Sequence, residues 1–171
     1  MKSRPAIVAD ARGLRIAILS SRFNAAIVDG LLAGARAALQ GMGGRHADWD
    51  EVEVPGAFEL PLAARAAAAS GRYDAVVALG AVIKGETDHY EHIAREAASG
   101  LAVVARETGV PVGFGLLTVI EEAHARVRSA QGPGNKGAEA ARAAVAMVHV
   151  LRKLAGRRSR GRKSPRTGGG R

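Results

Sequence analysis

The 171-residue sequence contains no cysteine, and this absence excludes two kinds of protein. A chain without cysteine forms neither a disulfide framework nor a thiolate metal site, and it suits a reducing cytoplasm. No window approaches the roughly 20 apolar residues that a membrane-spanning helix needs, and residues 1–13 contain no apolar run of signal-peptide length. We therefore expect a cytoplasmic protein without a membrane partner, built around one core.

Acidic residues are missing from the last segment, residues 156–171, which contains seven basic ones. Without those seven, 18 basic residues stand against 16 acidic ones, so the net charge of +9 belongs mainly to this tail. A segment of Arg, Gly, Ser and Pro has few apolar groups to bury, which predicts a disordered basic tail. Such a tail can bind nucleic acid weakly, but we expect it to be solvated and nucleic acid not to be the main partner.

Four short apolar runs alternate with longer alanine-rich runs along the remaining chain. The pattern predicts strands at 15–20, 51–54, 75–79 and 112–117, and helices at 25–40, 59–69, 89–108, 121–129 and 137–154. This order is typical of an α/β protein, a three-layer sandwich with a four-stranded parallel sheet flanked by helices. The strand runs are read as continuously apolar, as expected when both faces of a sheet are covered. We divide the chain into an N-terminal arm (1–13), one domain (14–155) and the tail (156–171).

Aromatic residues make up only 4% of the chain, so their positions are informative. Phe23 follows the first predicted strand and Phe58 the second. Any single Phe at a strand end is more often part of the core. In an open parallel sheet, however, ligands bind beyond the carboxyl ends of the strands. Two aromatic rings at that edge predict a platform on which a flat ring stacks.

The segment Gly80–Thr87 is interpreted as a loop with two glycines between the third strand and the next helix. Such a loop lets backbone amides approach an anion at the helix N-terminus, although a plain turn explains it equally well. His89 opens that helix, and histidine is the side chain best suited to proton transfer at neutral pH. His89 and His92 share a helix face, but no third strong ligand is evident, so we predict no metal site.

Several strings of residues occupy these strand ends and the turn before the last helix. They are Ser21–Asn24, Val54–Pro61, Leu79–Thr87, His89-Tyr90 and Gly134–Gly137. In this order and at these spacings they resemble the 6,7-dimethyl-8-ribityllumazine synthase family, over about residues 14–154. The resemblance implies a flavodoxin-like arrangement and a transferase of riboflavin biosynthesis. Its reaction joins 5-amino-6-(D-ribitylamino)uracil to 3,4-dihydroxy-2-butanone 4-phosphate without a metal or organic cofactor.

The resemblance also implies a role for each matching residue. The implied contacts to the pyrimidine and its ribityl chain are Phe23, Ala57, Phe58, Glu59, Ala81, Val82, Ile83 and Phe114. The implied contacts to the phosphate are Gly85, Glu86, Thr87, Arg128 and Lys136. His89 is the implied proton-transfer residue. Phe114 and Arg128 are expected to reach the site from an adjacent subunit.

Members of the family assemble as pentamers, some of which close into icosahedral shells. The resemblance therefore implies a homopentamer or a shell of pentamers, and association with riboflavin synthase is a further implied partnership. Two other functions stay open. One is a module of the same fold that binds a flavin or pteridine without catalysis, which would need neither His89 nor Arg128. The other is a nucleic-acid-associated protein that uses its tail, which would leave the strand-end motifs unexplained.

Overall fold

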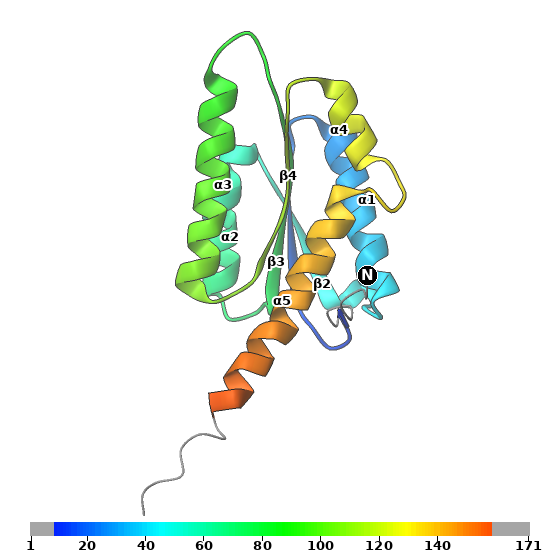
Figure 1. The fold of residues 1–171 in the computed structure, drawn as a ribbon, viewed down its shortest axis with the longest axis vertical. Coiled ribbons are helices and arrows are strands. Elements are labelled where there is room, and N and C mark those ends of the chain that lie inside the picture. The colour runs from blue at the N-terminus through cyan, green and yellow to red at the C-terminus, as the bar shows by residue number, and fades with distance from the viewer. Residues whose placement is uncertain (1–8, 159–171) are drawn as a thin grey trace, which may run out of the picture.

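A computed structural model describes residues 9–158 of the chain, which form three layers (Figure 1). The strands are β1 (Ile16–Ser21), β2 (Trp49–Val54), β3 (Ala75–Ile83) and β4 (Val112–Val119). They form one parallel sheet in the order β2-β1-β3-β4. The α-helices are α1 (Ala25–Gly41), α2 (Leu60–Ala69), α3 (His89–Thr108), α4 (Glu122–Ser129) and α5 (Lys136–Arg158). Two short 3-10 helices, η1 (His46–Asp48) and η2 (Ala57–Glu59), precede β2 and α2.

Helices α2 and α3 cover one face of the sheet, and α1, α4 and α5 cover the other (Figure 1). The predicted three-layer α/β sandwich is therefore confirmed. Because successive side chains of a strand point to opposite faces, β1 supplies two cores. Ile16 and Ile18 pack on the side of α1 and α5, whereas Ala17 and Leu19 pack on the side of α2.

The prediction of continuously apolar strands holds for β1 and for most of β3, but it is wrong for β2. Only Trp49 and Val54, the two ends of β2, are buried, and the residues between them are partly or fully exposed. The reason is its position, since β2 is an edge strand of the sheet. Polar residues in the middle of the strand are tolerated where one edge faces solvent.

Strand β3 continues to Ile83, beyond the predicted end at Leu79, because residues 80–83 pair with residues 116–119 of β4. Gly80 was expected to open a loop, and instead lies within the strand. A Cβ at Gly80 would lie 2.9 Å from both Ser21 Oγ and Leu116 Cδ1, which is too close. Glycine is therefore required here by packing, and the real connection to α3 is the short exposed segment 84–88.

Helix α5 also exceeds its predicted end, because it runs past Leu154 to Arg158 and includes residues that composition placed in the tail. Only Gly156 in this stretch is a poor helix former, and the sequence offers no residue that stops the helix at Leu154. The predicted disorder of the tail otherwise concerns residues 159–171, which lie outside the described residues, as do residues 1–8 of the arm. None of the helices within residues 9–158 combines the length and apolar character that crossing a membrane requires.

Helices α1 and α5 approach each other closely, and glycines make the approach feasible. A Cβ built at Gly137 would overlap the carbonyl oxygen of Leu31, and one built at Gly34 would overlap the Asn135 side chain. A Cβ at Gly30 would lie 2.5 Å from Ser129 O. Larger residues at these positions would push α1 away from α5 and from the turn that precedes it.

Asn135 fixes that turn, which connects α4 to α5. The residue is 1% exposed. The Nδ2 group lies 2.9 Å from Gly30 O and 2.8 Å from Ser129 O, to which it donates, and Oδ1 accepts from Ala138 N at 3.0 Å. One buried amide thus bonds to backbone groups of α1, α4 and α5. The Ser129 carbonyl and the Ala138 amide lie at helix ends, where backbone groups need partners from outside the helix.

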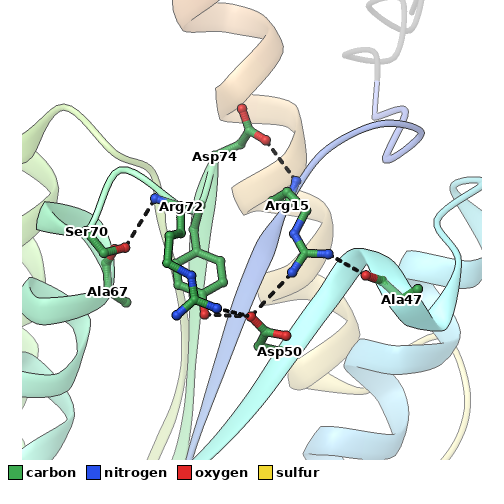
Figure 2. Close-up of polar contacts among 8 residues, drawn as sticks. Arg15, Ala47, Asp50, Ala67, Ser70, Arg72 and Asp74 are labelled. Atoms are coloured by element: carbon green, nitrogen blue, oxygen red, sulfur yellow. Dashed lines mark hydrogen bonds and ion pairs between the residues drawn. The ribbon is translucent and has the colours of Figure 1, made fainter.

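Charged residues gather at the amino-terminal edge of the sheet, where Arg15 and Arg72 approach Asp50 from two sides (Figure 2). Asp50 Oδ2 accepts from Tyr73 Oη at 2.7 Å and from Arg72 at 3.0 Å, and it lies 3.4 Å from the Arg15 guanidinium. The hydrogen bond from Tyr73, together with the two arginines, lowers the pKa of the Asp50 carboxyl below its ordinary value. The backbone amide of Arg15 donates to Asp74 at 2.8 Å.

Candidate active site

A cavity of about 290 Å³ lies at the carboxyl ends of the strands. The residues that line it are Phe23, Asn24, Gly56, Ala57, Phe58, Glu59, Ala81, Val82, Ile83, His89 and Ile93. Every residue that the sequence associated with the pyrimidine and ribityl chain is among them except Phe114, and so is the expected proton-transfer residue. Segments from three separate parts of the chain are thus brought together at one place.

The two aromatic residues of the cavity are exposed rather than part of the core. Phe23 lies between β1 and α1 and is 71% exposed, and Phe58 lies in η2 and is 57% exposed. Burying a phenylalanine contributes roughly 1.5–3 kcal/mol to stability, so leaving two of them at one edge indicates a surface that is covered by something else. A flat ring that stacks on Phe23 would provide such cover.

Gly56 allows Phe23 and Glu59 to come close to each other. A Cβ built at Gly56 would lie 3.0 Å from Glu59 Oε2 and 3.4 Å from Phe23 Cδ2, so the glycine touches both side chains. The segment that carries Phe23 is also fixed to the end of β2, because Arg22 N donates to Val54 O at 3.0 Å. The aromatic face and the carboxylate are therefore held on the same wall of the cavity.

The end of β3 presents backbone groups to the cavity. Lys84 N donates to Val119 O at 2.9 Å, so residue 84 directs its backbone toward β4. The backbone amide and carbonyl groups of successive residues in a strand point to alternate sides. Ala81 and Ile83 therefore direct their amides and carbonyls away from β4. The ladder between β1 and β3 ends at the pair Ser20 and Leu79. Among the described residues no strand pairs with that side of Ile83, and its amide and carbonyl therefore face the cavity.

His89 is the first residue of α3, and Ile93 lines the cavity one helical turn later. The positive end of the α3 dipole lies here, which favours an anion close to this helix start. Gly85, Glu86 and Thr87 form the exposed connection just before α3. They are not among the residues that line the cavity, so the structure places them beside it.

Three of the expected contacts lie elsewhere in the chain. Phe114 on β4 is 50% exposed and lines a second cavity, of about 330 Å³, between β4 and α3. Arg128 donates to His124 O at 3.0 Å within α4, and Lys136 Nζ lies 2.7 Å from the Glu139 carboxylate. Among the described residues, neither Lys nor Arg lines the first cavity.

Asn24, Gly56 and Ile93 line the cavity, although the sequence reasoning gave them no role. Asn24 and Gly56 stand inside the strings that carried the resemblance, and Ile93 follows His89 by four positions on the same helix. Helical periodicity was thus the signal available for Ile93. Within residues 9–158 the side chains form no group of three or more His, Cys, Asp or Glu that could hold a metal ion.

The family model described as 6,7-dimethyl-8-ribityllumazine synthase matches residues 13–152. The chain belongs to the 6,7-dimethyl-8-ribityllumazine synthase family. A lumazine synthase from Nitratidesulfovibrio vulgaris strain DP4 is 48% identical over 145 residues, which are 85% of this chain and 93% of that protein. One from Deinococcus deserti is 49% identical over 144 residues, which are 84% of this chain and 92% of that protein.

Membership of the lumazine synthase family makes the chain a transferase of riboflavin biosynthesis, as its motifs had implied. The match begins one residue before the predicted domain and ends within α5. It contains every residue of the cavity described above, and also Phe114, Arg128 and Lys136.

Proposed function

We propose that this chain condenses 5-amino-6-(D-ribitylamino)uracil with 3,4-dihydroxy-2-butanone 4-phosphate to give 6,7-dimethyl-8-ribityllumazine. The observation that carries the proposal is the content of the cavity. An exposed aromatic ring, a carboxylate, a row of backbone groups and a histidine surround it, whereas no lysine or arginine among the described residues does. These groups suit a heterocycle that carries several hydroxyls. Because they include no cation from Lys or Arg, the charge of the phosphate has to be neutralised by residues of another subunit.

Each part of the pyrimidine substrate has a matching partner. The exposed ring of Phe23 stacks on the heterocycle. The backbone amide and carbonyl of Ile83, with Ala81 and Val82 beside them, bind the polar edge of the pyrimidine. The Glu59 carboxylate accepts hydrogen bonds from the ribityl hydroxyls, and Ala57 and Phe58 form the wall along that chain.

The phosphate of the second substrate binds next to the N-terminus of α3. Gly85, Glu86 and Thr87 contribute backbone amides there, since a helix start favours anions. Arg128 and Lys136 of an adjacent copy supply positive charge, and Phe114 of that copy closes the cavity over the ring. Exposure of Phe114 and Arg128 supports this arrangement, because both are available to a neighbour.

The reaction needs correct placement more than strong acid or base. The 5-amino group attacks the ketone, and loss of water gives an imine. Elimination then expels inorganic phosphate, and the ribityl-bearing nitrogen closes the second ring with loss of another water. No electrons are gained or lost. Holding two reactants together can supply about 7–11 kcal/mol of the barrier, whereas His89, as a proton carrier between these steps, contributes about 10²–10⁴-fold.

We further propose that the active protein is a homopentamer, or a shell of pentamers, in the cytoplasm, and that it can associate with riboflavin synthase. The separation of Phe114, Arg128 and Lys136 from the cavity supports a site that is shared between copies. Exposed apolar side chains such as Leu62 at 75% and Ile120 at 68% also support burial in an assembly. Light scattering on the purified protein distinguishes monomer, pentamer and shell, and a monomer would contradict the proposal.

Two experiments test the proposed function. In the first, the two substrates are mixed with the protein, and formation of the lumazine is followed by its absorbance and fluorescence. A protein that binds lumazine without forming it would be a binding module, which is the competing interpretation.

The second experiment tests sharing of the site. In the proposed pentamer, Glu59 and Arg128 reach each site from two different subunits. A pentamer made only of Glu59→Ala or only of Arg128→Ala therefore has a defect in every site. When the two variants are co-refolded, some sites combine an intact Glu59 with an intact Arg128 from different copies. We expect a recovery of activity that neither variant shows alone. A mixture no more active than its components would show that each site lies within one subunit.

A further inference from the structure

Asn24 has a backbone conformation that side-chain-bearing residues rarely adopt. It has φ 58° and ψ 45°, and it is the one non-glycine residue with positive φ among residues 9–158. Asparagine tolerates this left-handed conformation better than most residues, but the conformation persists only where surrounding contacts enforce it. Those contacts lie beside the cavity, since Asn24 is one of its lining residues.

The side chain of Asn24 does not perform the task that asparagine usually performs at a helix start. At the N-cap position an asparagine normally accepts a hydrogen bond from an amide of the first turn. Here the side chain makes no such cap. Backbone bonds to Asn24 instead come from the third and fourth residues of α1. The amides of Ile27 and Val28 lie 2.9 and 3.1 Å from Asn24 O, to which they donate. The left-handed backbone thus leaves the side-chain amide available for another partner.

That partner is β3. Asn24 Nδ2 donates to Ala81 O at 2.8 Å, across the gap between the start of α1 and the sheet. The hydrogen-bond ladder between β1 and β3 ends at the pair Ser20 and Leu79, so the Ala81 carbonyl lies just beyond the last rung. The Asn24 amide takes the place of the β1 backbone at that position and continues the ladder by one bond.

We propose that Asn24 is a positioning residue for the pyrimidine, because it fixes the β3 backbone that binds the ring without serving as its main contact. This inference rests on the proposed function. Fixing Ala81 O orients the adjoining peptides, and Ile83 directs its amide and carbonyl to the same side. The donor and acceptor for the pyrimidine are then set in place before the substrate arrives, which lowers the ordering cost of binding.

Two variants and one control separate this role from a purely structural one. Asn24→Gly accepts positive φ without strain but removes the bond to Ala81. Asn24→Asp keeps the size and the turn preference, but a carboxylate cannot donate to a carbonyl. Ala25→Gly is the matched control, because it weakens the exposed first residue of α1 and leaves the Asn24 bond intact.

In the assembled enzyme we expect both Asn24 variants to raise the KM for the pyrimidine by roughly 3- to 10-fold, the size of one hydrogen bond. The KM for the ketone phosphate should stay unchanged. Asn24→Gly should melt within a few degrees of the wild type, since glycine suits the turn. Amide hydrogen exchange at residues 81–83 of the ligand-free protein should be faster in both variants than in the wild type and Ala25→Gly.

The inference is overturned if the Asn24 variants match Ala25→Gly in both the pyrimidine KM and amide exchange at residues 81–83. A raised KM with unchanged exchange in the free protein also overturns it, because Asn24 would then act by touching the substrate. If the wild type itself formed no lumazine, the proposed function would fail instead. The exchange measurement needs no turnover and would still decide whether Asn24 holds β3.

Discussion

The two edges of the sheet differ in whether their carboxylates are paired with positive charges of the same chain. At the amino-terminal edge, Asp50 is bonded to Tyr73 and paired with Arg15 and Arg72, so its charge is neutralised within the chain (Figure 2). At the carboxyl edge, Glu59 lines a cavity that no cation among the described residues enters. The Asp50 cluster at the first edge is neutralised within the chain, whereas no lysine or arginine among the described residues lines the cavity at the second edge. Under the proposed function, a ligand and a neighbouring copy complete that cavity.

The difference follows from the direction of the strands. In a parallel sheet every strand ends at the same edge, and each following helix begins there with its positive dipole end. Polar groups that line the cavity at that edge are placed where a ligand binds, whereas the charged groups around Asp50 at the other edge bond to one another. Polar stabilisation near the carboxyl edge is instead buried, as in Asn135 beneath the turn between α4 and α5.

The largest expected effect concerns Arg128, which we propose an adjacent copy contributes to the cavity at the carboxyl edge. Arg128→Ala should lower kcat/KM for the ketone phosphate by roughly 100-fold or more, because a dianion loses charge-assisted hydrogen bonds. His89→Ala should cost less, since placement supplies most of the acceleration. Steady-state rates of the two variants provide the comparison, and a worse defect in His89→Ala would reverse the ranking.

Loss of the buried amide at position 135 should have the next largest effect. Asn135→Ala removes the side-chain partner of the Ser129 carbonyl and of the Ala138 amide, and a third bond to Gly30 O, which we expect to reduce the free energy of unfolding by about 2–4 kcal/mol. The KM for the ketone phosphate should also rise, because this turn connects Arg128 to Lys136. Gln131→Ala, in the same turn but exposed, is the control and should stay within about 0.5 kcal/mol of wild type. Equal denaturation midpoints for the two variants would show that the Asn135 contacts contribute little.

A pair of neutralising substitutions tests whether the two edges are independent. Asp50→Asn should lower the melting temperature by a few degrees and leave both KM values unchanged, because its partners Arg15 and Arg72 would then repel each other unopposed. Glu59→Gln should do the reverse, with an unchanged melting temperature and a raised KM for the pyrimidine. A KM change in Asp50→Asn would mean that the edges are coupled.

Acid should reduce the stability that the Asp50 cluster contributes at the amino-terminal edge of the sheet. Bonding from Tyr73 lowers the pKa of Asp50. In the segment before β1, bonding from Arg12 likewise lowers the pKa of Asp10 to about 2. A carboxyl with a lowered folded pKa stabilises the protein above its unfolded pKa of about 3.9, and this contribution is lost as pH falls through the folded value. Melting temperatures between pH 6 and pH 2 should therefore fall less steeply in Asp50→Asn than in wild type. Identical slopes would exclude a role for Asp50 in acid unfolding.

The smallest effect concerns Ser21, which is 2% exposed and whose Oγ lacks a hydrogen-bond partner in the described part of the chain. Ser21→Ala removes a buried hydroxyl that gains nothing from folding, so we expect stability to stay level or rise by up to about 1 kcal/mol. Turnover should not change. A clear loss of stability on chemical denaturation would indicate that the hydroxyl has a partner in solution.

The sequence predicts which residues gather at the carboxyl edge, because each short apolar run of a strand is followed by a change to polar, glycine or aromatic residues. The convergence of Phe23, Glu59 and His89 follows from the strand order and the rule for parallel sheets. The extension of β3 was missed because Gly80 was interpreted as a loop residue, and only its packing against Ser21 and Leu116 explains a glycine inside a strand. The edge position of β2 depends on long-range pairing, which local patterns do not encode.

The rest of the site depends on tertiary geometry. The sequence pattern places Asn24 after a strand but does not specify its left-handed backbone or its bond to Ala81. Likewise, the distance between the cavity and Arg128 is a property of the folded chain. The resemblance to a family, rather than periodicity, suggested that a second copy supplies that residue.

The close approach of α1 and α5 sets a limit on engineering this chain. Exchanging helical glycines for alanine is a common way to raise thermal stability, but at Gly34 and Gly137 the added methyl group would overlap existing atoms. A Cβ added at Gly41, at the end of the same α1, would have no atom of the described residues outside its own helix turn within 4 Å. Replacing every helical glycine by alanine would therefore raise stability at Gly41 but disrupt the packing of α1 and α5 at Gly34 and Gly137.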